Sequence, residues 1–167
     1  MFGRGFSFGP YSGTLRHLVR ELKFRNRRRV AERFAEMIER DPQAVELLAS
    51  GGVLVPVPLH PRRRRERGFN QSELLASALA RRSRLPLAAR ALVRRRDTPT
   101  QTGLSAAQRR DNVRGAFAIR ERSKVAGRIV VLVDDVLTTG ATVRECAAAL
   151  LEAGALSVRV LTVARVV

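Results

Sequence analysis

Residues 130–142 read VVLVDDVLTTGAT, and this stretch decides the fold. The run that begins at Ile129 is apolar through Val133, which is typical of a strand buried on both faces. After a short turn, residues 141–153 place apolar side chains at helical spacing before Gly154. A strand, a turn and a helix in this order predict one βα unit of an α/β fold.

The turn between this strand and this helix carries residues that predict chemistry. Two adjacent carboxylates, Asp134 and Asp135, are costly in a low-dielectric interior, so their position predicts hydroxyl groups or a divalent cation as partners. Small residues and hydroxyl residues let backbone N–H groups converge on an oxyanion at a helix N-terminus. The residues concerned are Thr138, Thr139, Gly140, Ala141 and Thr142. Together these parts predict a phosphate site beside a site for a sugar diol.

Each part of this pattern also has an ordinary structural explanation. Two acids can end a strand, and threonines often cap a helix. The full spacing favours one binding site, because every element stands where such a site needs it. The sequence contains neither Gly-x-x-x-x-Gly-Lys-Ser/Thr nor a Gly-x-Gly-x-x-Gly that opens a strand-to-helix turn, which excludes the two commonest nucleotide-binding loops.

The rest of the chain alternates between helical spacing and short apolar runs. We expect helices over residues 12–24, 30–38, 42–48 and 70–82, and strands over residues 53–59, 91–93, 116–119 and 157–167. This alternation predicts a mainly parallel central sheet flanked by helices, with ligands bound beyond the carboxyl ends of the strands. We expect a single globular domain, in which an N-terminal helical segment over residues 1–50 packs on a core over residues 51–167.

Composition sets broad limits on location and redox chemistry. The 167 residues contain no apolar stretch of about 18 residues and no secretory leader pattern, so we expect a soluble cytoplasmic protein without membrane insertion. Cys146 is the single cysteine, which excludes an intrachain disulfide and a multi-cysteine zinc site. Its place in an apolar helical pattern predicts a packing role.

The charge of the chain predicts attraction to polyanions. The formal net charge is +17, and all but Lys23 and Lys124 of the 32 basic residues are arginine. Three interpretations remain open: a solvated basic surface, a small phosphorylated substrate, and a nucleic acid. The preference for arginine is also consistent with a GC-rich genome, so charge alone does not separate them.

The loop over residues 130–142 resembles the signature of type I phosphoribosyltransferases. The resemblance implies that Asp134 and Asp135 hold the ribose hydroxyls of 5-phosphoribosyl-1-pyrophosphate, with Mg²⁺ held indirectly through the ligand. It also implies that the backbone of residues 138–142 holds the 5′-phosphate.

Three further blocks resemble the ComF family, which is associated with competence and DNA uptake. They are Tyr11-Ser12-Gly13-Thr14-Leu15 with Leu22-Lys23-Phe24, then VPVPLHP over residues 55–61 with RGFNQ over residues 67–71, and finally Thr98, Gln101 and Leu104 with Arg109, Asn112 and Val113. The resemblance implies the type I phosphoribosyltransferase fold and partners in the DNA-uptake machinery. ComF-type proteins commonly begin with a cysteine-rich zinc module; with Cys146 as the single cysteine, we expect no zinc here, whether the start is truncated or the lineage lacks the module.

Basic and polar stretches supply the remaining candidate ligands. Guanidinium groups bind phosphate oxygens at two points, so in the basic loop after the 53–59 strand Arg67 is the first candidate for pyrophosphate and Arg62 the second. A solvated loop and a nucleic-acid contact are alternatives, and His60 fits a structural turn residue. Related transferases carry a mobile hood where residues 94–114 fall. The side chains expected to reach the ligand from it are Gln101, Arg109, Arg110 and Asn112.

Two functions remain open. The first is phosphoribosyl transfer, although Thr138 stands where purine-salvage relatives carry a carboxylate, which disfavours a purine acceptor. The second is a non-catalytic accessory protein that binds single-stranded DNA during uptake. Base-stacking sites need aromatic side chains, and these make up 5% of the chain.

Overall fold

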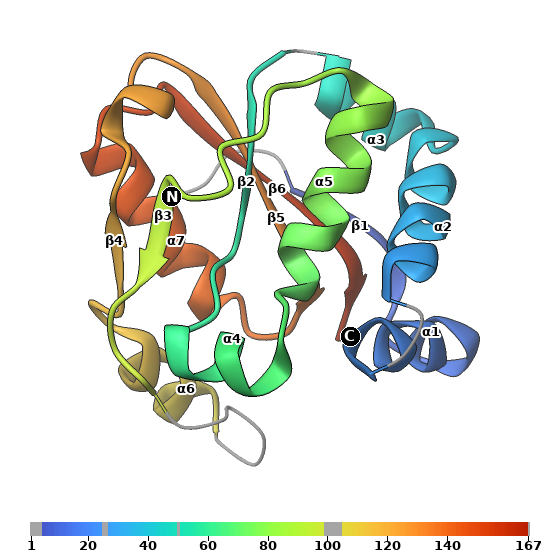
Figure 1. Cartoon of the computed structure of the whole chain (residues 1–167), viewed down its shortest axis with the longest axis horizontal. Helices are drawn as coiled ribbons and strands as arrows, with labels where there is room; N and C mark the ends of the chain where they lie inside the picture. Colours follow the sequence, from blue (N-terminus) through green and yellow to red (C-terminus); the bar gives the residue numbers. More distant parts are fainter. Residues whose placement is uncertain (1–4, 25–26, 50, 99–104, 167) are drawn as a thin grey trace.

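The central sheet is parallel throughout (Figure 1). The computed structural model describes residues 5–24, 27–49, 51–98 and 105–166. Within these residues the sheet has the strand order β1-β6-β5-β2, and its strands are β1 (Gly5–Pro10), β2 (Val53–Pro56), β5 (Ile129–Leu137) and β6 (Ser157–Arg165). The expected α/β class with a mainly parallel sheet is confirmed.

Helices cover both faces of the sheet (Figure 1). One face carries α1 (Gly13–Phe24), α2 (Arg27–Glu39), α3 (Pro42–Ala49) and α5 (Gln71–Ser83). The opposite face carries α7 (Ala141–Glu152) and an antiparallel pair, β3 (Leu92–Arg94) with β4 (Phe117–Ile119). The remaining elements are α4 (Pro61–Arg67), α6 (Ala106–Val113) and a 3-10 turn over Arg122–Lys124. In the part of the chain described, no helix is both long and apolar enough to cross a membrane.

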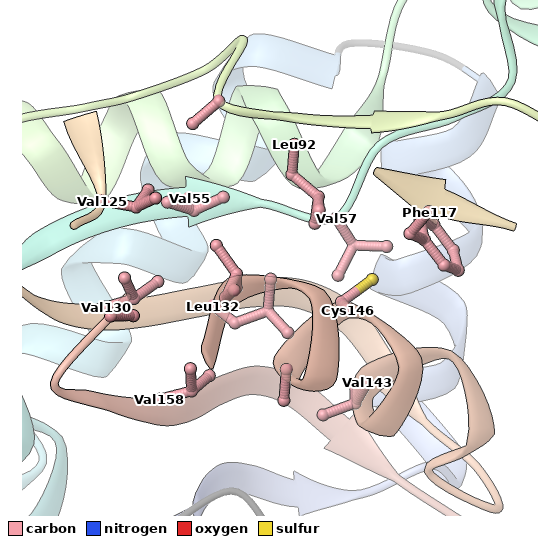
Figure 2. Close-up of a cluster of buried hydrophobic side chains, with 14 of the residues drawn as sticks. Val55, Val57, Leu92, Phe117, Val125, Val130, Leu132, Val143, Cys146 and Val158 are labelled. Carbon is pink, nitrogen blue, oxygen red and sulfur yellow. The ribbon is translucent and has the colours of Figure 1, made fainter. Parts of the chain in front are cut away.

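Strand β5 is apolar along its first half because both of its faces are buried. Val130 and Leu132 pack under α7, in the cluster that Figure 2 shows around Cys146. Val131 and Val133 point the other way, into the cluster beneath α2 and α5. The predicted packing role of Cys146 is confirmed, and burial raises the pKa of its thiol.

Several elements differ from the sequence-based expectation. The segment over residues 1–50 begins with a strand, β1, which pairs in parallel with β6 and joins the sheet at its edge. The basic run expected as a loop is helix α4; the side chain of His60 caps its start, and Gly68 ends it with a φ of 79°. Strand β5 continues beyond Val133, because its pairing with β6 runs on to Leu137. The two acids therefore lie within the strand.

Gly52, which precedes β2, tests how closely its backbone approaches the start of β5. A Cβ at Gly52 would lie 2.5 Å from the carbonyl oxygen of Ile129, whereas one at Gly51 would meet no described atom within 4 Å. Both glycines have positive φ, so both alanine variants are strained, and only one also clashes with backbone. We expect Gly51→Ala to lower the free energy of unfolding by about 1 kcal/mol and Gly52→Ala by about 3 kcal/mol or more, measured by urea denaturation. Equal losses would contradict the close approach of these backbones.

Candidate functional site

A cavity of about 520 Å³ opens at the carboxyl ends of β2 and β5. This is where ligands bind in parallel α/β sheets, so its place agrees with the expectation from the fold. The residues that line it come from five regions of the chain: Tyr11 and Lys23; Val57, Pro58 and Leu59; Arg63, Arg67, Gln71 and Ser72; Arg94; and Asp134 to Thr138 with Gly140 to Val143.

The floor of the cavity is the acid pair of β5. Asp135 is 6% exposed and accepts two contacts from the face that α1 and α5 cover. The ammonium of Lys23 lies 3.1 Å from its Oδ2, and the amide of Gln71 donates to the same atom at 3.5 Å. Its other oxygen accepts the backbone N–H of Val136 at 2.8 Å. Asp135 is therefore held in place before any ligand binds.

Asp134 is held differently from its neighbour. Its Oδ1 accepts a hydrogen bond from the hydroxyl of Ser72 at 2.9 Å and another from the backbone N–H of Asp135 at 2.9 Å. Burial, and then the charge of Asp135, raise the pKa of Asp134 to about 7. One carboxylate of the pair thus carries a proton easily, and the other is paired with a cation.

The RGFNQ block has a structural explanation. Gly68 ends α4, and Phe69 is buried, so the chain turns back toward the sheet. Asn70 then caps α5: its Oδ1 accepts the N–H of Ser72 at 3.0 Å, and its Nδ2 donates to the carbonyl of Val57 at 2.9 Å. This cap fixes the first turn of α5, which places Gln71 and Ser72 against the two acids.

The predicted phosphate loop lies at one end of the cavity. Gly140 has a φ of 72° and caps α7, whose first turn faces the cavity through Ala141 and Thr142. Thr138 also lines the cavity, whereas Thr139 is not among the described lining residues. The hydroxyl of Thr139 is buried without a partner in the described part of the chain. The loop thus offers a helix N-terminus, which attracts anions.

Three arginines form a wall beside the acids: Arg63, Arg67 and Arg94. Arg67, predicted from the sequence, donates to the side chain of Gln71 at 2.8 Å. Arg63 stands four residues earlier on α4 and donates to the carbonyl of Thr98 at 2.8 Å. The sequence reasoning missed Arg63 and Arg94. Helical spacing from Arg67 was the available signal for Arg63, once α4 is known to be a helix.

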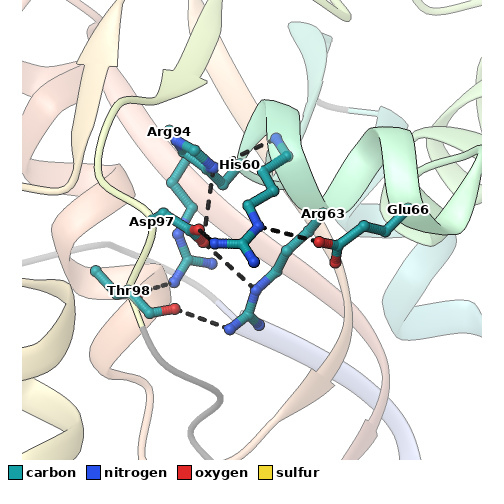
Figure 3. Close-up of polar contacts among 7 residues, drawn as sticks. His60, Arg63, Glu66, Arg94, Asp97 and Thr98 are labelled. Atoms are coloured by element: carbon teal, nitrogen blue, oxygen red, sulfur yellow. Dashed lines mark hydrogen bonds and ion pairs between the residues drawn. The ribbon is translucent and has the colours of Figure 1, made fainter.

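Arg94 is the least exposed of the three, at 9%. Its guanidinium donates to the hydroxyl of Thr98 and lies 5.5 Å from the centre of the Phe117 ring (Figure 3 shows Arg63, Arg94 and Thr98). Among the described residues it forms no ion pair, and its Nε has no hydrogen-bond partner. Burial and the neighbouring charge of Arg63 lower its pKa. A buried cation without a counter-ion favours the binding of an anion here.

Arg62, the second predicted pyrophosphate ligand, points elsewhere. It pairs with Glu66 at 3.0 Å and Asp97 at 3.4 Å, and it lines a separate surface hollow with these residues (Figure 3 labels Glu66 and Asp97). His60 accepts the N–H of Arg62 at 3.3 Å, in agreement with the predicted structural role of this histidine.

The predicted hood residues are only partly described. Gln101 lies outside the described residues, as do the side chains of Arg109 and Arg110 on α6. Asn112 is half-buried on α6 and is not among the described residues that line the cavity. The start of α6 is capped by Ser105, whose hydroxyl accepts the N–H of Gln108 at 3.2 Å.

Comparison with known proteins identifies the family. Residues 70–166 match the phosphoribosyl transferase domain family. The DNA utilization protein YhgH of Escherichia coli is 39% identical over 155 residues, which cover 90% of this chain and 66% of that protein. Competence protein F of Haemophilus influenzae is 35% identical over 161 residues, which cover 94% of this chain and 70% of that protein. The chain belongs to the ComF family. The matched part of the chain thus spans about two thirds of the length of these ComF relatives.

Two more distant matches agree with this assignment. Competence protein ComFC of Bacillus subtilis is 38% identical over 102 residues, or 61% of this chain and 39% of that protein. A solved structure described as the allosteric regulatory enzyme of purine biosynthesis superposes with a TM-score of 0.53 at 24% identity, over 79% of this ComF-family chain and 25% of that one. This second likeness concerns the fold alone, and it confirms the expected phosphoribosyltransferase fold.

The raised pKa of Asp134 predicts a dependence of stability on pH. From the ordinary value of 3.8 up to about 7, the folded protein holds a proton that the unfolded chain releases. The free energy of unfolding should therefore fall as pH rises through that range and level off above it. Asp134→Asn removes this slope. In urea denaturation, the free energy of unfolding of the variant minus that of the wild type should therefore be larger at about pH 8 than at about pH 5. The same substitution at exposed Asp111 is the control, and parallel pH profiles for all three proteins would contradict the prediction.

Proposed function

We propose that the cavity binds 5-phosphoribosyl-1-pyrophosphate together with Mg²⁺ and that the protein transfers the phosphoribosyl group to an acceptor. One observation carries the proposal: a single cavity combines an acid pair, a helix N-terminus with a small-residue loop, and a wall of arginines that includes the buried Arg94, which forms no ion pair among the described residues. These three parts match a sugar diol, a monophosphate and a pyrophosphate, in a molecule that carries all three groups.

Each part of the ligand has a complementary group in the proposed complex. The ribose hydroxyls donate to the carboxylates of Asp134 and Asp135, and the 5′-phosphate accepts from the backbone amides that open α7. The pyrophosphate lies against Arg63, Arg67 and Arg94. A guanidinium can donate two parallel hydrogen bonds to a phosphate, so these side chains suit a multiply charged group better than point charges would.

The residues of the cavity fit a magnesium ion that is shared with the ligand. The described residues contain no group of three or more histidine, cysteine, aspartate or glutamate side chains that could hold a metal by themselves. Mg²⁺ usually binds through one or two carboxylates, with substrate phosphates and water completing its shell. Asp134 and Asp135 would supply those carboxylates, and the bound ion would help to neutralise the charge that develops on the pyrophosphate.

The arginine wall suits the departure of pyrophosphate. As the bond between C1 and its oxygen breaks, negative charge grows on the leaving group beside Arg94, which is desolvated and has no counter-ion within the part of the chain that the structure describes. Fixed cations in a partly dry site stabilise such charge more than water does. Thr138 lines the cavity but cannot accept a proton at neutral pH, which agrees with an acceptor that is not a purine.

We also propose that this activity serves DNA uptake. Relatives with 35% to 39% identity carry the names competence protein F and DNA utilization protein YhgH. The proposal includes a cytoplasmic location and contact with the uptake machinery.

Calorimetric titration with 5-phosphoribosyl-1-pyrophosphate and Mg²⁺ tests the proposed ligand. We expect Arg94→Met to weaken binding by about 10-fold or more, because a desolvated charge-assisted contact is lost, and the double variant Asp134→Ala/Asp135→Ala to weaken it at least as much. Arg95→Met is the matched control, since Arg95 is exposed and is not among the lining residues. Absence of wild-type binding, or equal binding by the double variant, would refute the site.

A second candidate function is single-stranded DNA binding without catalysis. Its supporting observation is helix α4, which exposes Arg62, Arg64, Arg65 and Arg67 on a chain of net charge +17. If this helix binds the DNA backbone, the logarithm of the affinity falls with the logarithm of salt concentration by about 0.7 per phosphate contact. Arg65→Gln should then reduce the slope by about that amount in fluorescence anisotropy titrations. A flat salt dependence rules out this function, and pyrophosphate release with any acceptor shows that the protein is more than an accessory.

A further inference from the structure

Two residues from the start of the chain line the cavity and are assigned no direct contact with the phosphoribosyl donor in the proposed complex. Tyr11 follows β1, and Lys23 lies in the last turn of α1. Both precede the region that matches the phosphoribosyl transferase family, residues 70–166. In Figure 1, α1 and α4 flank the carboxyl ends of β5 and β6 from opposite sides. The cavity therefore has a second wall, which we name the N-terminal wall and define as Tyr11 and Lys23.

A series of polar contacts runs from the N-terminal wall, through the acid pair, to the arginine wall. Lys23 lies 3.1 Å from Asp135, Gln71 donates to the same carboxylate at 3.5 Å, and Arg67 donates to Gln71 at 2.8 Å. The acids thus stand between the N-terminal wall and the arginines. If the ribose lies on the acids and pyrophosphate on the arginines, the N-terminal wall faces the side of C1 that is remote from the leaving group. A nucleophile that displaces pyrophosphate in line must approach from that side.

Lys23 can bind a second partner while it holds Asp135. An ammonium group has three N–H donors, and within the described residues its one recorded partner is Asp135. The side chain is 30% exposed and lines the cavity, so its remaining donors are available there. Once hydroxyl groups and a metal ion engage the two carboxylates, the charge of Lys23 is less compensated, which favours a negatively charged neighbour.

Tyr11 adds a flat surface to this wall. Its backbone N–H donates to the carbonyl of Arg165 at 2.7 Å, which ties it to the end of β6. The half-buried ring packs against the core on the side of α1 and also lines the cavity. Aromatic side chains favour planar partners through stacking and edge contacts. A ring and a cation on one wall suit a flat anion.

We propose that Tyr11 and Lys23 form the acceptor site and that the acceptor is a planar heteroaromatic ring bearing a negative charge. This inference rests on the proposed phosphoribosyl transfer. Beyond the acid pair assigned to the ribose, the described lining residues include no carboxylate that could take a proton from the acceptor. An attacking ring nitrogen that carries no proton needs no such base.

The step balances without any further reactant. The lone pair of the ring nitrogen forms the new bond to C1, and the bond between C1 and the pyrophosphate oxygen breaks with its electron pair leaving on pyrophosphate. A pyridine-type nitrogen becomes cationic and releases no proton. In a ring that attacks through an N–H, the proton passes to solvent. Lys23 binds the anionic substituent of the ring and does not itself react.

Matched pairs of acceptors separate charge from ring shape. Nicotinate and nicotinamide share the same proton-free ring nitrogen and differ in charge, and orotate and uracil differ by one carboxylate. Isothermal titration of the protein saturated with pyrophosphate and Mg²⁺ measures their binding without turnover, and pyrophosphate release from the phosphoribosyl donor measures transfer. We expect at least one anionic member to bind about 10-fold more tightly than its neutral partner and to be the one that releases pyrophosphate.

Variants locate this preference on the N-terminal wall. Lys23→Gln should abolish the difference between anionic and neutral acceptors, while Lys23→Arg should retain most of it. Tyr11→Ala should weaken both members of a pair, whereas Tyr11→Phe should not. Arg20→Gln is the matched control for charge, because Arg20 is exposed on the same helix and is not among the described lining residues.

The outcomes distinguish the inference from the function on which it rests. If the wild type fails to bind the phosphoribosyl donor, the proposed function itself falls. If the donor binds but no anionic acceptor is preferred in binding or transfer, or if Lys23→Gln keeps the preference, the assignment of the acceptor site is wrong. A preference that disappears in Lys23→Gln and persists in Arg20→Gln supports it.

Discussion

The continuous pairing of β5 between β2 and β6 is the constraint on which the cavity depends. Because β5 stays in register with β6 through Leu137, two adjacent carboxylates are carried to the edge of a buried sheet. Their cost in that environment is met by partners from two helices on one face of the sheet, with Ser72 and Gln71 from α5 and Lys23 from α1. The cap at Asn70 aligns α5, so Asn70 and Gln71 of the RGFNQ block act through the acids, while Arg67 of the same block lines the cavity directly.

The electrostatics of the cavity are divided between its two ends. The acid pair is compensated within the protein, whereas Arg94 of the arginine wall is not: it is buried against Phe117, and its one hydrogen-bond partner among the described residues is the hydroxyl of Thr98. Keeping such a charge costs stability, and a folded protein tolerates the cost where a ligand supplies the missing counter-ion. The cavity therefore has a floor whose negative charge is compensated by the protein and a wall that carries net positive charge at Arg94.

The sequence predicted the parts of the fold that depend on local patterns. The apolar run of β5, the amphipathic α7 and the spacing of the intervening loop are strong signals, and the structure has all three. Strand β1 was missed because its six residues, GFSFGP, include two glycines and a proline and form an edge strand whose pairing with β6 lies far away in sequence. Helix α4 was missed because a run of arginines shows no apolar periodicity.

In the candidate site, too, the residues that are adjacent in sequence could be predicted, and those brought together by the fold could not. The acids and the loop are contiguous in sequence, so their spacing identified them. Arg94 and Lys23 come from elements distant in sequence, and only the fold brings them to one cavity. Within a run of basic residues, the composition could not indicate that Arg63 lines the cavity while Arg62 is not among its described lining residues.

The pairing of β1 with β6 also has a consequence for the order of events during synthesis. The hydroxyls of Ser7 and Thr162 meet at 2.7 Å across 155 positions of sequence, and the amide of Tyr11 is held by Arg165. Contacts of such long range form late, because the intervening chain must first be closed into a loop. A chain still on the ribosome, with β6 not yet emerged, cannot place β1 or Tyr11. The cavity is therefore completed only when the first and last strands of the sheet meet, and a chain shortened within β6 would lose the contact that places Tyr11 together with the pairing of its edge strand.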